Sequence, residues 1–288
     1  MDNKGMDVRR GPGLFLSDVD GTLLKTREPV PPAALAAVRR WMEAGGRFAL
    51  STGRCLRSAR RLVEEIPVNA PCILCGGALV YDFSQGRALY ARPLEEGTLG
   101  KLGAVLEGYP GVSVTVTTQE EVYNLRVNGR LRARGVEEDA DAPLAALGDV
   151  RGAVVKVLFT EDDPAVLEEL RERLFSGGGE TFSFASRHFC ELTARGVDKG
   201  SAAAFLRGIF GGCRMYTAGD AMSDVYMAEI SDRFFAPLSA PGEVRAQADR
   251  LFPPPWEGGI AEAFRCALED GGARGERPGD GQQGWRET

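Results

Sequence analysis

The sequence predicts an α/β protein whose parallel sheet is interrupted by an α+β unit. Strand and helix patterns alternate at the start of the chain, adjacent strand patterns dominate its middle, and the alternation returns near its end. Alternation at this spacing is typical of a parallel sheet with right-handed crossovers, whereas adjacent strand patterns favour antiparallel pairing. We therefore expect a discontinuous core domain at residues 1–84 and 194–270, with an inserted domain at residues 85–193.

The first part of the core is expected to hold three strands, two helices and a hairpin partner. Two prolines open the first helix and two glycines end it, as helix start and stop signals do. In chain order the elements are the strand Leu14–Ser17, the helix in PPAALAAVRRWMEAGG, the strand RFALS, the helix Cys55–Ile66, the strand CILC and the hairpin partner ALVYDF.

The inserted domain is expected to combine short strands with two helices. Alternating apolar and polar residues predict the strands. The polar stretch Asn128–Asp149 contains the charge run EEDADAP, which we interpret as a solvated connection without a site. The expected elements are the helix Leu94–Leu106, the strands VSVTVTT, EVYNLRV and AVVKVLFT, the helix Pro164–Phe175, and the strands TFSFAS and HFCELT.

The core is expected to resume with a helix that Asp198 caps and that runs through Phe210. The strand RMYTAG, the helix Met222–Ile230, the strand RFFAPL and the helix Pro241–Ala248 follow. Residues 271–288 carry too little apolar surface to offset their ordering entropy, so we expect a disordered tail there.

Composition excludes several classes of partner. The 288 residues carry a formal net charge of -6 and a pI of about 5.2, so no positive field attracts nucleic acid or an anionic membrane. The start of the chain lacks a secretory signal pattern, and no apolar run approaches the roughly 20 residues that span a bilayer. We expect a cytoplasmic protein, and the sequence leaves monomer and homodimer open.

The counts of histidine and cysteine limit the chemistry. His188 is the single histidine, which argues against Ser-His, Cys-His and histidine-cluster metal sites. Of six cysteines only Cys72 and Cys75 share a CxxC spacing, inside a stretch that reads as a buried strand. Catalysis must therefore rely on carboxylates, lysine, hydroxyl groups or a metal.

Acidic side chains follow the predicted core strands. Asp18 and Asp20 end the first strand, Thr52 ends the second, and Asp220 and Asp224 follow a later one, where we expect them to share a helix face. The carboxyl ends of parallel strands gather ligands, so the four carboxylates should converge. Like charges this close require a cation, and Mg²⁺ suits oxygen ligands.

Four motifs resemble those of the haloacid dehalogenase superfamily. SDVDGTLL resembles its first signature, DxDGT, and STGR, GVDKG and GDAMSD resemble its second, third and fourth motifs, in the family order. An insertion between the second and third motifs is similar to the large cap of the Cof-type sugar-phosphate phosphatases. The resemblance thus implies a Rossmann-like parallel-sheet core domain with an inserted α+β cap domain.

The resemblance also implies catalytic roles for the carboxylates. Asp18 would be the nucleophile that forms an aspartyl-phosphate, and Asp20 would be the general acid and base beside it. Asp18, the main-chain carbonyl of Asp20 and Asp220 would hold Mg²⁺, with Asp224 as a further ligand or a support.

Phosphate binding is implied for Thr52, Gly53 and Lys199. Ser223 stands where the fourth motif usually carries asparagine, and its shorter hydroxyl is a candidate phosphate donor. Gly76 likewise stands where the loop after the third strand commonly carries asparagine. Both departures suggest an altered substrate preference or a reduced rate.

Residues of the inserted domain are left open as substrate contacts. Arg126 and Lys156 lie on predicted strands and either hold a second anionic group or face solvent. Glu191, Thr193 and Arg195 border the predicted hinge, where a structural role explains them as well as a substrate contact.

The leading hypothesis is a Mg²⁺-dependent phosphatase that hydrolyses small phosphorylated metabolites, such as sugar phosphates. One alternative is a phosphotransferase that resembles phosphomannomutase. The other is a catalytically weak binding or regulatory protein, which the residues at positions 76 and 223 make conceivable.

Overall fold

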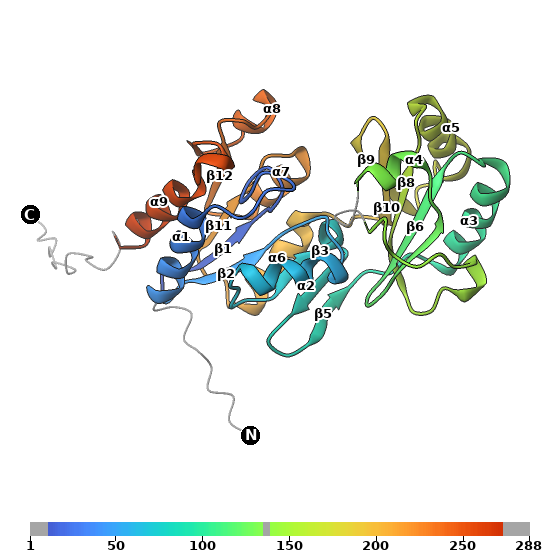
Figure 1. Ribbon diagram of the computed structural model, residues 1–288. Coiled ribbons are helices and arrows are strands. Elements are labelled where there is room, and N and C mark those ends of the chain that lie inside the picture. The colour runs from blue at the N-terminus through green and yellow to red at the C-terminus, as the bar shows by residue number, and fades with distance from the viewer. Residues whose placement is uncertain (1–10, 135–138, 273–288) are drawn as a thin grey trace, which may run out of the picture.

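The computed structural model describes residues 11–134 and 139–272, and Figure 1 shows them as two lobes. The first and last parts of the chain share one lobe, and the middle part forms the other. A parallel sheet and additional antiparallel sheets, with helices packed on them, confirm the predicted α/β fold class.

The core sheet is wholly parallel and has the strand order β13-β12-β11-β1-β2. Leu14 of β1 pairs with Met215 of β11 on one side and with Arg47 of β2 on the other. The residues that follow β1, β2 and β11 therefore lie at the same edge. The core strands are β1 (Leu14–Ser17), β2 (Arg47–Leu50), β11 (Met215–Ala218), β12 (Arg233–Pro237) and β13 (Arg250–Phe252).

Aromatic packing fixes one face of the core sheet. Phe15 of β1 stacks on Phe264 with 4.1 Å between ring centroids and meets the edge of Trp41. Figure 1 shows the helices that carry these two rings, α1 and α9, on the same side of the sheet. The core helices are α1 (Pro32–Glu43), α2 (Leu56–Glu65), α6 (Lys199–Ile209), α7 (Met222–Ala228), α8 (Gly242–Arg245) and α9 (Ile260–Gly272).

A three-stranded antiparallel sheet continues from the core sheet. Its strand β3 is joined to the core through a parallel bridge between Ser51 and Ile73, and β4 is the predicted hairpin partner. The chain forms a further strand, β5, where we expected the inserted domain to begin. The strands are β3 (Cys72–Leu74), β4 (Leu79–Asp82) and β5 (Arg87–Ala91).

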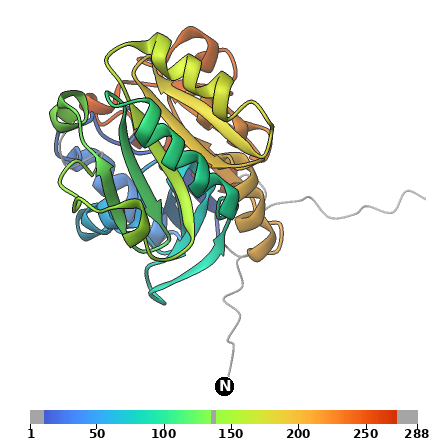
Figure 2. The same ribbon diagram turned by 90° about the vertical axis from the view of Figure 1, so that its right-hand side faces the viewer.

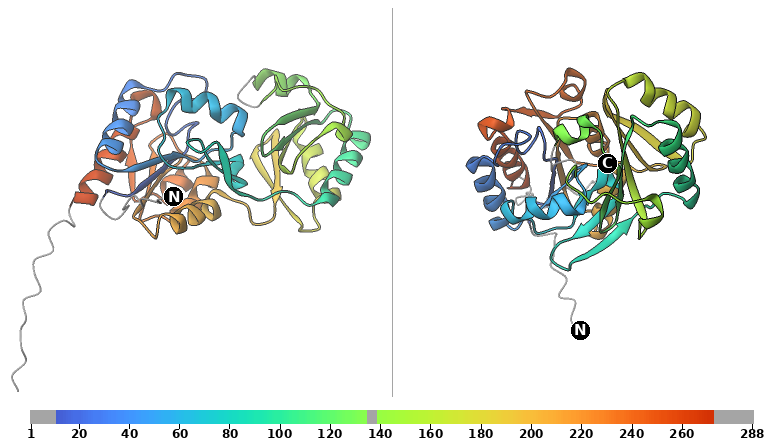
Figure 3. Two further views of the ribbon diagram at one scale, coloured as in Figure 1. Left: turned by 90° about the horizontal axis from the view of Figure 1, so that it is seen from below. Right: turned by 45° about the vertical axis from the view of Figure 1, so that its right-hand side comes forward.

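The sheet of the other lobe, here called the cap sheet, is antiparallel with the order β7-β6-β8-β10-β9. Figure 2 shows α3 and α5 lying across its outer face, and both views of Figure 3 place them away from the core lobe. The elements are α3 (Glu96–Gly108), β6 (Ser113–Thr118), β7 (Val122–Arg126), α4 (Gly129–Arg134), β8 (Val154–Thr160), α5 (Pro164–Leu174), β9 (Glu180–Ser186) and β10 (Phe189–Ala194).

Period-two alternation gives the cap sheet one apolar and one polar face. Val116, Val157 and Leu192 point into the apolar cluster under α3 and α5. Their neighbours on the opposite face are Thr117, Lys156 and Thr193, which pair side by side across β6, β8 and β10. The polar face is thus continuous, and it is the face that α3 and α5 leave uncovered.

Several sequence expectations need correction or lie outside the described residues. The stretch Asn128–Asp149 contains α4 and a short 3₁₀ helix, where we expected only a connection. The final helix α9 reaches Gly272, so most of the expected tail at 271–288 falls outside the described residues. Within residues 11–134 and 139–272, no helix combines the length and apolarity needed to cross a membrane.

Candidate active site

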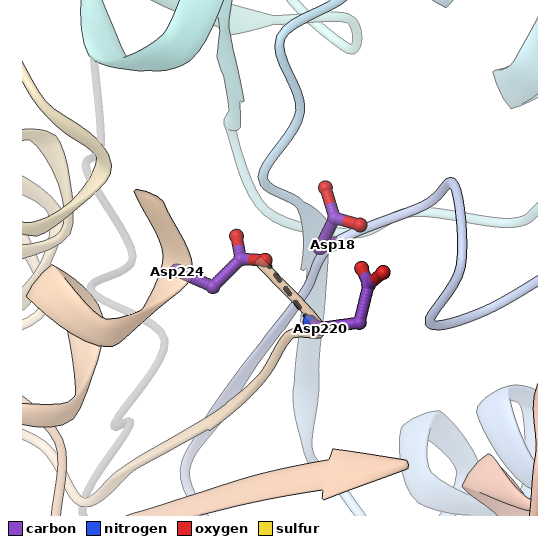
Figure 4. Close-up of side chains that lie close together, drawn as sticks. All are labelled: Asp18, Asp220 and Asp224. Carbon is purple, nitrogen blue, oxygen red and sulfur yellow. Dashed lines mark hydrogen bonds between the residues drawn. The ribbon is translucent and has the colours of Figure 1, made fainter. Parts of the chain in front are cut away.

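Three carboxylates meet at the carboxyl edge of the core sheet. Asp18 directly follows β1, Asp220 follows β11, and Asp224 lies in the first turn of α7. One oxygen from each lies within 4.8 Å of the other two, and Figure 4 shows Asp18 and Asp220 side by side with Asp224 across from them. The predicted convergence therefore holds for three of the four carboxylates.

Lys199 is the cation that this cluster contains. Its Nζ donates to Asp18 Oδ1 at 2.7 Å and to Asp224 Oδ1 at 2.6 Å, and all three side chains are buried. Lys199 is the first residue of α6, which Asp198 caps by accepting from the Ser201 amide, as predicted. The helix start therefore places the ammonium group between the ends of β1 and α7.

Asp224 organises the loop that carries Asp220. Its Oδ2 accepts from the main-chain amides of Asp220 and Ala221, at 3.1 and 2.9 Å. The expectation that Asp220 and Asp224 share a helix face is wrong, because α7 begins only at Met222. The loop folds back instead, so both carboxylates still reach the cluster.

The charge of the cluster is incompletely balanced. Burial raises the pKa of Asp18 well above its usual range, and Asp224 and Asp220 add to this against the opposing effect of Lys199. Burial and Asp224 also raise the pKa of Asp220 to about 6. Burial alone would lower the pKa of Lys199, but Asp18 and Asp224 raise it above its usual value.

This donor set fits a hard divalent cation. It consists of carboxylate oxygens, the ligands that Mg²⁺ prefers, and its three acids exceed its one lysine in charge. Both oxygens of Asp224 already accept hydrogen bonds, from Lys199 and from the loop amides. Asp18 and Asp220 are therefore the better placed direct ligands.

Gly21 allows Asp220 to approach the first motif. Its φ is 94°, and a Cβ at this position would lie 2.3 Å from Asp220 Oδ2. Thr22 next to it donates to Asp220 Oδ1 at 3.0 Å. The glycine and the threonine of the DGT stretch thus serve the position of a carboxylate about 200 residues further along the chain.

We expect Gly21→Ala to weaken metal binding by at least about tenfold, because the added Cβ would lie 2.3 Å from Asp220 Oδ2 and would displace this carboxylate from the cluster. Titration calorimetry with Mg²⁺ measures the affinity. Gly86→Ala is the matched control, since Gly86 also has a positive φ, 65°, but no atom within 4 Å of the added Cβ. Equal affinities for the two variants would contradict this role of Gly21.

Asp20 lies outside the three-carboxylate cluster but lines the same cavity. Arg54 binds it through two parallel bonds, Nε to Oδ2 at 2.8 Å and Nη2 to Oδ1 at 2.7 Å. This paired geometry fixes the orientation of the carboxylate. Arg54 is therefore a positioning residue that our sequence analysis did not identify.

The predicted phosphate-binding residues surround the cluster. Thr52 is buried two residues after β2, and it lines the same cavity as Asp18, together with Gly53, Lys199 and Ser223. The main-chain oxygen of Gly53 already accepts from Lys156 at 2.7 Å. The structure thus brings these predicted residues together, and their roles remain predictions.

The cavity has a volume of about 600 Å³ and lies between the core edge and the polar face of the cap sheet. Asp18, Thr52 and Lys199 line it from the core, and Lys156 and Glu191 from the cap sheet. A cavity lined by acids and a lysine at one side, and by hydroxyl groups and a Lys–Glu pair at the other, suits a small polar ligand.

Two of the residues left open by the sequence are now placed. Lys156 faces the cavity and donates to Glu191 Oε1 at 2.9 Å, whereas Arg126 donates to the carbonyls of Leu106 and Tyr109 beneath α3. The apolar and polar alternation of β8 would have predicted that Lys156 lies opposite the apolar face. Arg126 holds cap main chain and is not a cavity residue.

Asp139 shows that the interpretation of the EEDADAP run as a solvated connection is wrong for this residue. Its side chain is buried, lines the cavity and accepts a bond from the Cys55 thiol at 2.8 Å. Burial raises the pKa of Asp139, and Cys55, Lys156 and Arg57 partly oppose the effect. No periodic pattern in this stretch predicted that the Asp139 side chain is buried.

Cys72 and Cys75 confirm the prediction that this pair lies buried. Cys72 and Cys75 are both free and buried. Burial raises the pKa of Cys72 to about 12, and burial together with Asp139 raises that of Cys55 to about 11. These thiols therefore stay protonated at neutral pH.

Known proteins resemble this chain in parts of the sequence and in the whole fold. The pyridoxal phosphate phosphatase YbhA of Escherichia coli (strain K12) is 31% identical over 77 residues, which are 27% of this chain and 28% of that protein. The 5-amino-6-(5-phospho-D-ribitylamino)uracil phosphatase YcsE of Bacillus subtilis (strain 168) is 23% identical over 88% of this chain and 94% of that protein.

The fold matches a crystal structure of a haloacid dehalogenase-like hydrolase from Bacteroides thetaiotaomicron. The TM-score is 0.79 at 19% identity, over 88% of this chain and 98% of that one. A family model described as haloacid dehalogenase-like hydrolase matches residues 15–264, which include all four motifs. Because this match covers most of the chain, the protein belongs to the haloacid dehalogenase-like hydrolases.

Proposed function

We propose that the protein is a Mg²⁺-dependent phosphatase that hydrolyses small phosphomonoesters through an aspartyl-phosphate on Asp18. The observation that supports this proposal is the pair of hydrogen bonds that Lys199 donates to Asp18 and Asp224. Asp220 lies within 4.8 Å of both acids, and Asp18, Lys199 and Asp220 line the cavity. A buried carboxylate beside a fixed cation and further acids is what in-line attack on a phosphorus atom requires.

The residues of the chain have distinct roles in this proposal. Asp18 attacks phosphorus, while Lys199 compensates the charge on the phosphoryl oxygens and Thr52 donates to them. Asp20 gives a proton to the leaving oxygen and later takes one from the attacking water. Each Asp20 oxygen accepts one bond from Arg54, which leaves a second lone pair on each oxygen for the proton.

Asp18 and Asp220 would hold the metal, together with the main-chain carbonyl of Asp20, and Asp224 would support them. When bound, Mg²⁺ would neutralise phosphoryl oxygens and the excess charge of the acids. The raised pKa values of Asp18 and Asp220 support this assignment, because they reflect acids whose charge is not fully compensated.

The relatives support a small phosphorylated metabolite as the substrate. These relatives are named as phosphatases of pyridoxal phosphate and of a phosphorylated ribitylaminouracil. Both compounds are monoesters of small molecules with several polar groups. The cavity volume of about 600 Å³ is of the size that such molecules require.

The proposal is tested by incubating the purified protein and Mg²⁺ with a panel of phosphomonoesters and measuring free phosphate. Release of phosphate from at least one sugar phosphate supports hydrolysis. Movement of the phosphoryl group within a sugar phosphate, without phosphate release, would favour a mutase, and no reaction with any ester would contradict catalysis.

Metal removal is expected to abolish phosphate release, because the acids of the cluster would repel the substrate. The measurement compares the rate after EDTA treatment and dialysis with the rate after addition of Mg²⁺. Restoration by Mg²⁺ is expected. Full activity of the metal-free protein would contradict the proposed role of Asp220.

A further inference from the structure

The cap sheet presents two cross-strand rows of side chains to the cavity. Thr117, Lys156 and Thr193 form one row, and the other runs through Leu158 and Glu191. Threonine hydroxyls accept as well as donate hydrogen bonds, so they do not decide the charge of a ligand. The charge that a ligand can carry here is decided by the two charged residues of this face, Lys156 and Glu191.

Lys156 is already compensated by the protein. Its Nζ donates to Glu191 Oε1 at 2.9 Å and to the Gly53 carbonyl at 2.7 Å, and its side chain is only 7% exposed. The positive charge of the wall is therefore matched by a carboxylate before any ligand binds. A second anionic group of a substrate would meet a neutral ion pair.

Glu191 reaches over Gly76. Its Oε2 lies 3.9 Å from the Cβ that a side chain at position 76 would add, and its Oε1 lies 3.8 Å from that of Gly53. Gly76 stands where the family's loop commonly carries asparagine. The glycine thus leaves space at the cavity wall, and the carboxylate of Glu191 faces that space.

The other basic side chains of the cavity are compensated in the same way. The cavity lining contains six acidic and four basic side chains, and each of the four basic ones donates to a protein oxygen. A second anionic group of a substrate would therefore have to compete with a protein oxygen for any of them.

We propose that Glu191 determines specificity by holding Lys156 in an ion pair, and that the site selects a phosphomonoester whose leaving group carries no second anionic group. This inference rests on the proposed phosphatase function and narrows its substrate class. A second anionic group would have to displace the carboxylate from Lys156 and would meet its negative charge.

The first test reverses the charge preference. Glu191→Gln keeps the shape of the side chain but leaves Lys156 without its carboxylate partner. We expect the ratio of kcat/KM for fructose 1,6-bisphosphate to that for fructose 6-phosphate to rise by about tenfold in this variant. A gain with the bisphosphate does not result from misfolding, so an unchanged or lower ratio overturns the role of Glu191.

The second test is a matched control. Glu180→Gln also removes a carboxylate from a lysine, Lys101, but Glu180 does not line the cavity, so the same ratio should stay unchanged. An equal rise in both variants overturns the role of Glu191.

The two proposals fail in different ways. If the unchanged protein with Mg²⁺ releases no phosphate from any ester of the panel, the proposed function and this inference both fall. If it hydrolyses them but prefers the bisphosphate to the monophosphate, the proposed function stands and the inference is overturned.

Discussion

Asp18→Asn is expected to reduce steady-state phosphate release by at least about 10³-fold, because the amide that replaces the carboxylate is not a nucleophile. The fold should persist. Asparagine has nearly the same shape, its carbonyl oxygen can still accept from Lys199, and it removes one charge from a cluster whose three acids exceed its one lysine.

The measurement combines steady-state kinetics with mass spectrometry of acid-quenched protein. The unchanged protein should carry a phosphoryl group during turnover, on the peptide that contains Asp18, and the variant should carry none. Asp162→Asn serves as the control, because this acid is exposed and binds only at the surface, to Arg130. A variant at position 18 with normal turnover would rule out the aspartyl-phosphate route.

Lys199→Met is expected to lower the free energy of unfolding by about 3–5 kcal/mol in the absence of metal, since it leaves buried carboxylates without their cation. Lys199 is 4% exposed, and its two partners Asp18 and Asp224 are buried with it. Activity should fall as well, because the lysine that compensates the transferred phosphoryl group is lost.

Urea denaturation in EDTA measures the stability, and the same experiment in Mg²⁺ measures how far a divalent ion replaces the lysine. We expect Mg²⁺ to restore part of the stability but not the activity. Lys25→Met is the control, because the Lys25–Glu28 pair is exposed and such pairs contribute about 0–1 kcal/mol. Equal stability losses in both variants would show that Lys199 is not a structural counter-ion.

Local patterns were sufficient for the elements that depend on them. The strand before Asp18, the Asp198 cap of α6 and the alternating strands of the cap sheet all follow from short-range rules of burial and hydrogen bonding. The four motifs also identified the acids and the lysine that meet at the core edge.

Long-range contacts account for what was missed. Strand β5 forms because β4 offers it an edge, and nothing within Arg87–Ala91 marks which sheet it joins. Asp139 is buried because it packs against Cys55 of the core lobe and accepts a hydrogen bond from its thiol, although its own stretch of sequence is strongly polar. Arg54 reaches hydrogen-bond distance of Asp20 because β1 pairs with β2.

The sequence by itself determined most of the order of elements, the family motifs and the acids and lysine that meet at the core edge, because each depends on residues close together in the chain. Only the tertiary structure decided which of those groups share a cation, which acids pair with arginine or lysine, and which cap residues face the cavity. The physical reason is that charge compensation and burial depend on distances between segments that are far apart in sequence, such as Asp18 and Lys199.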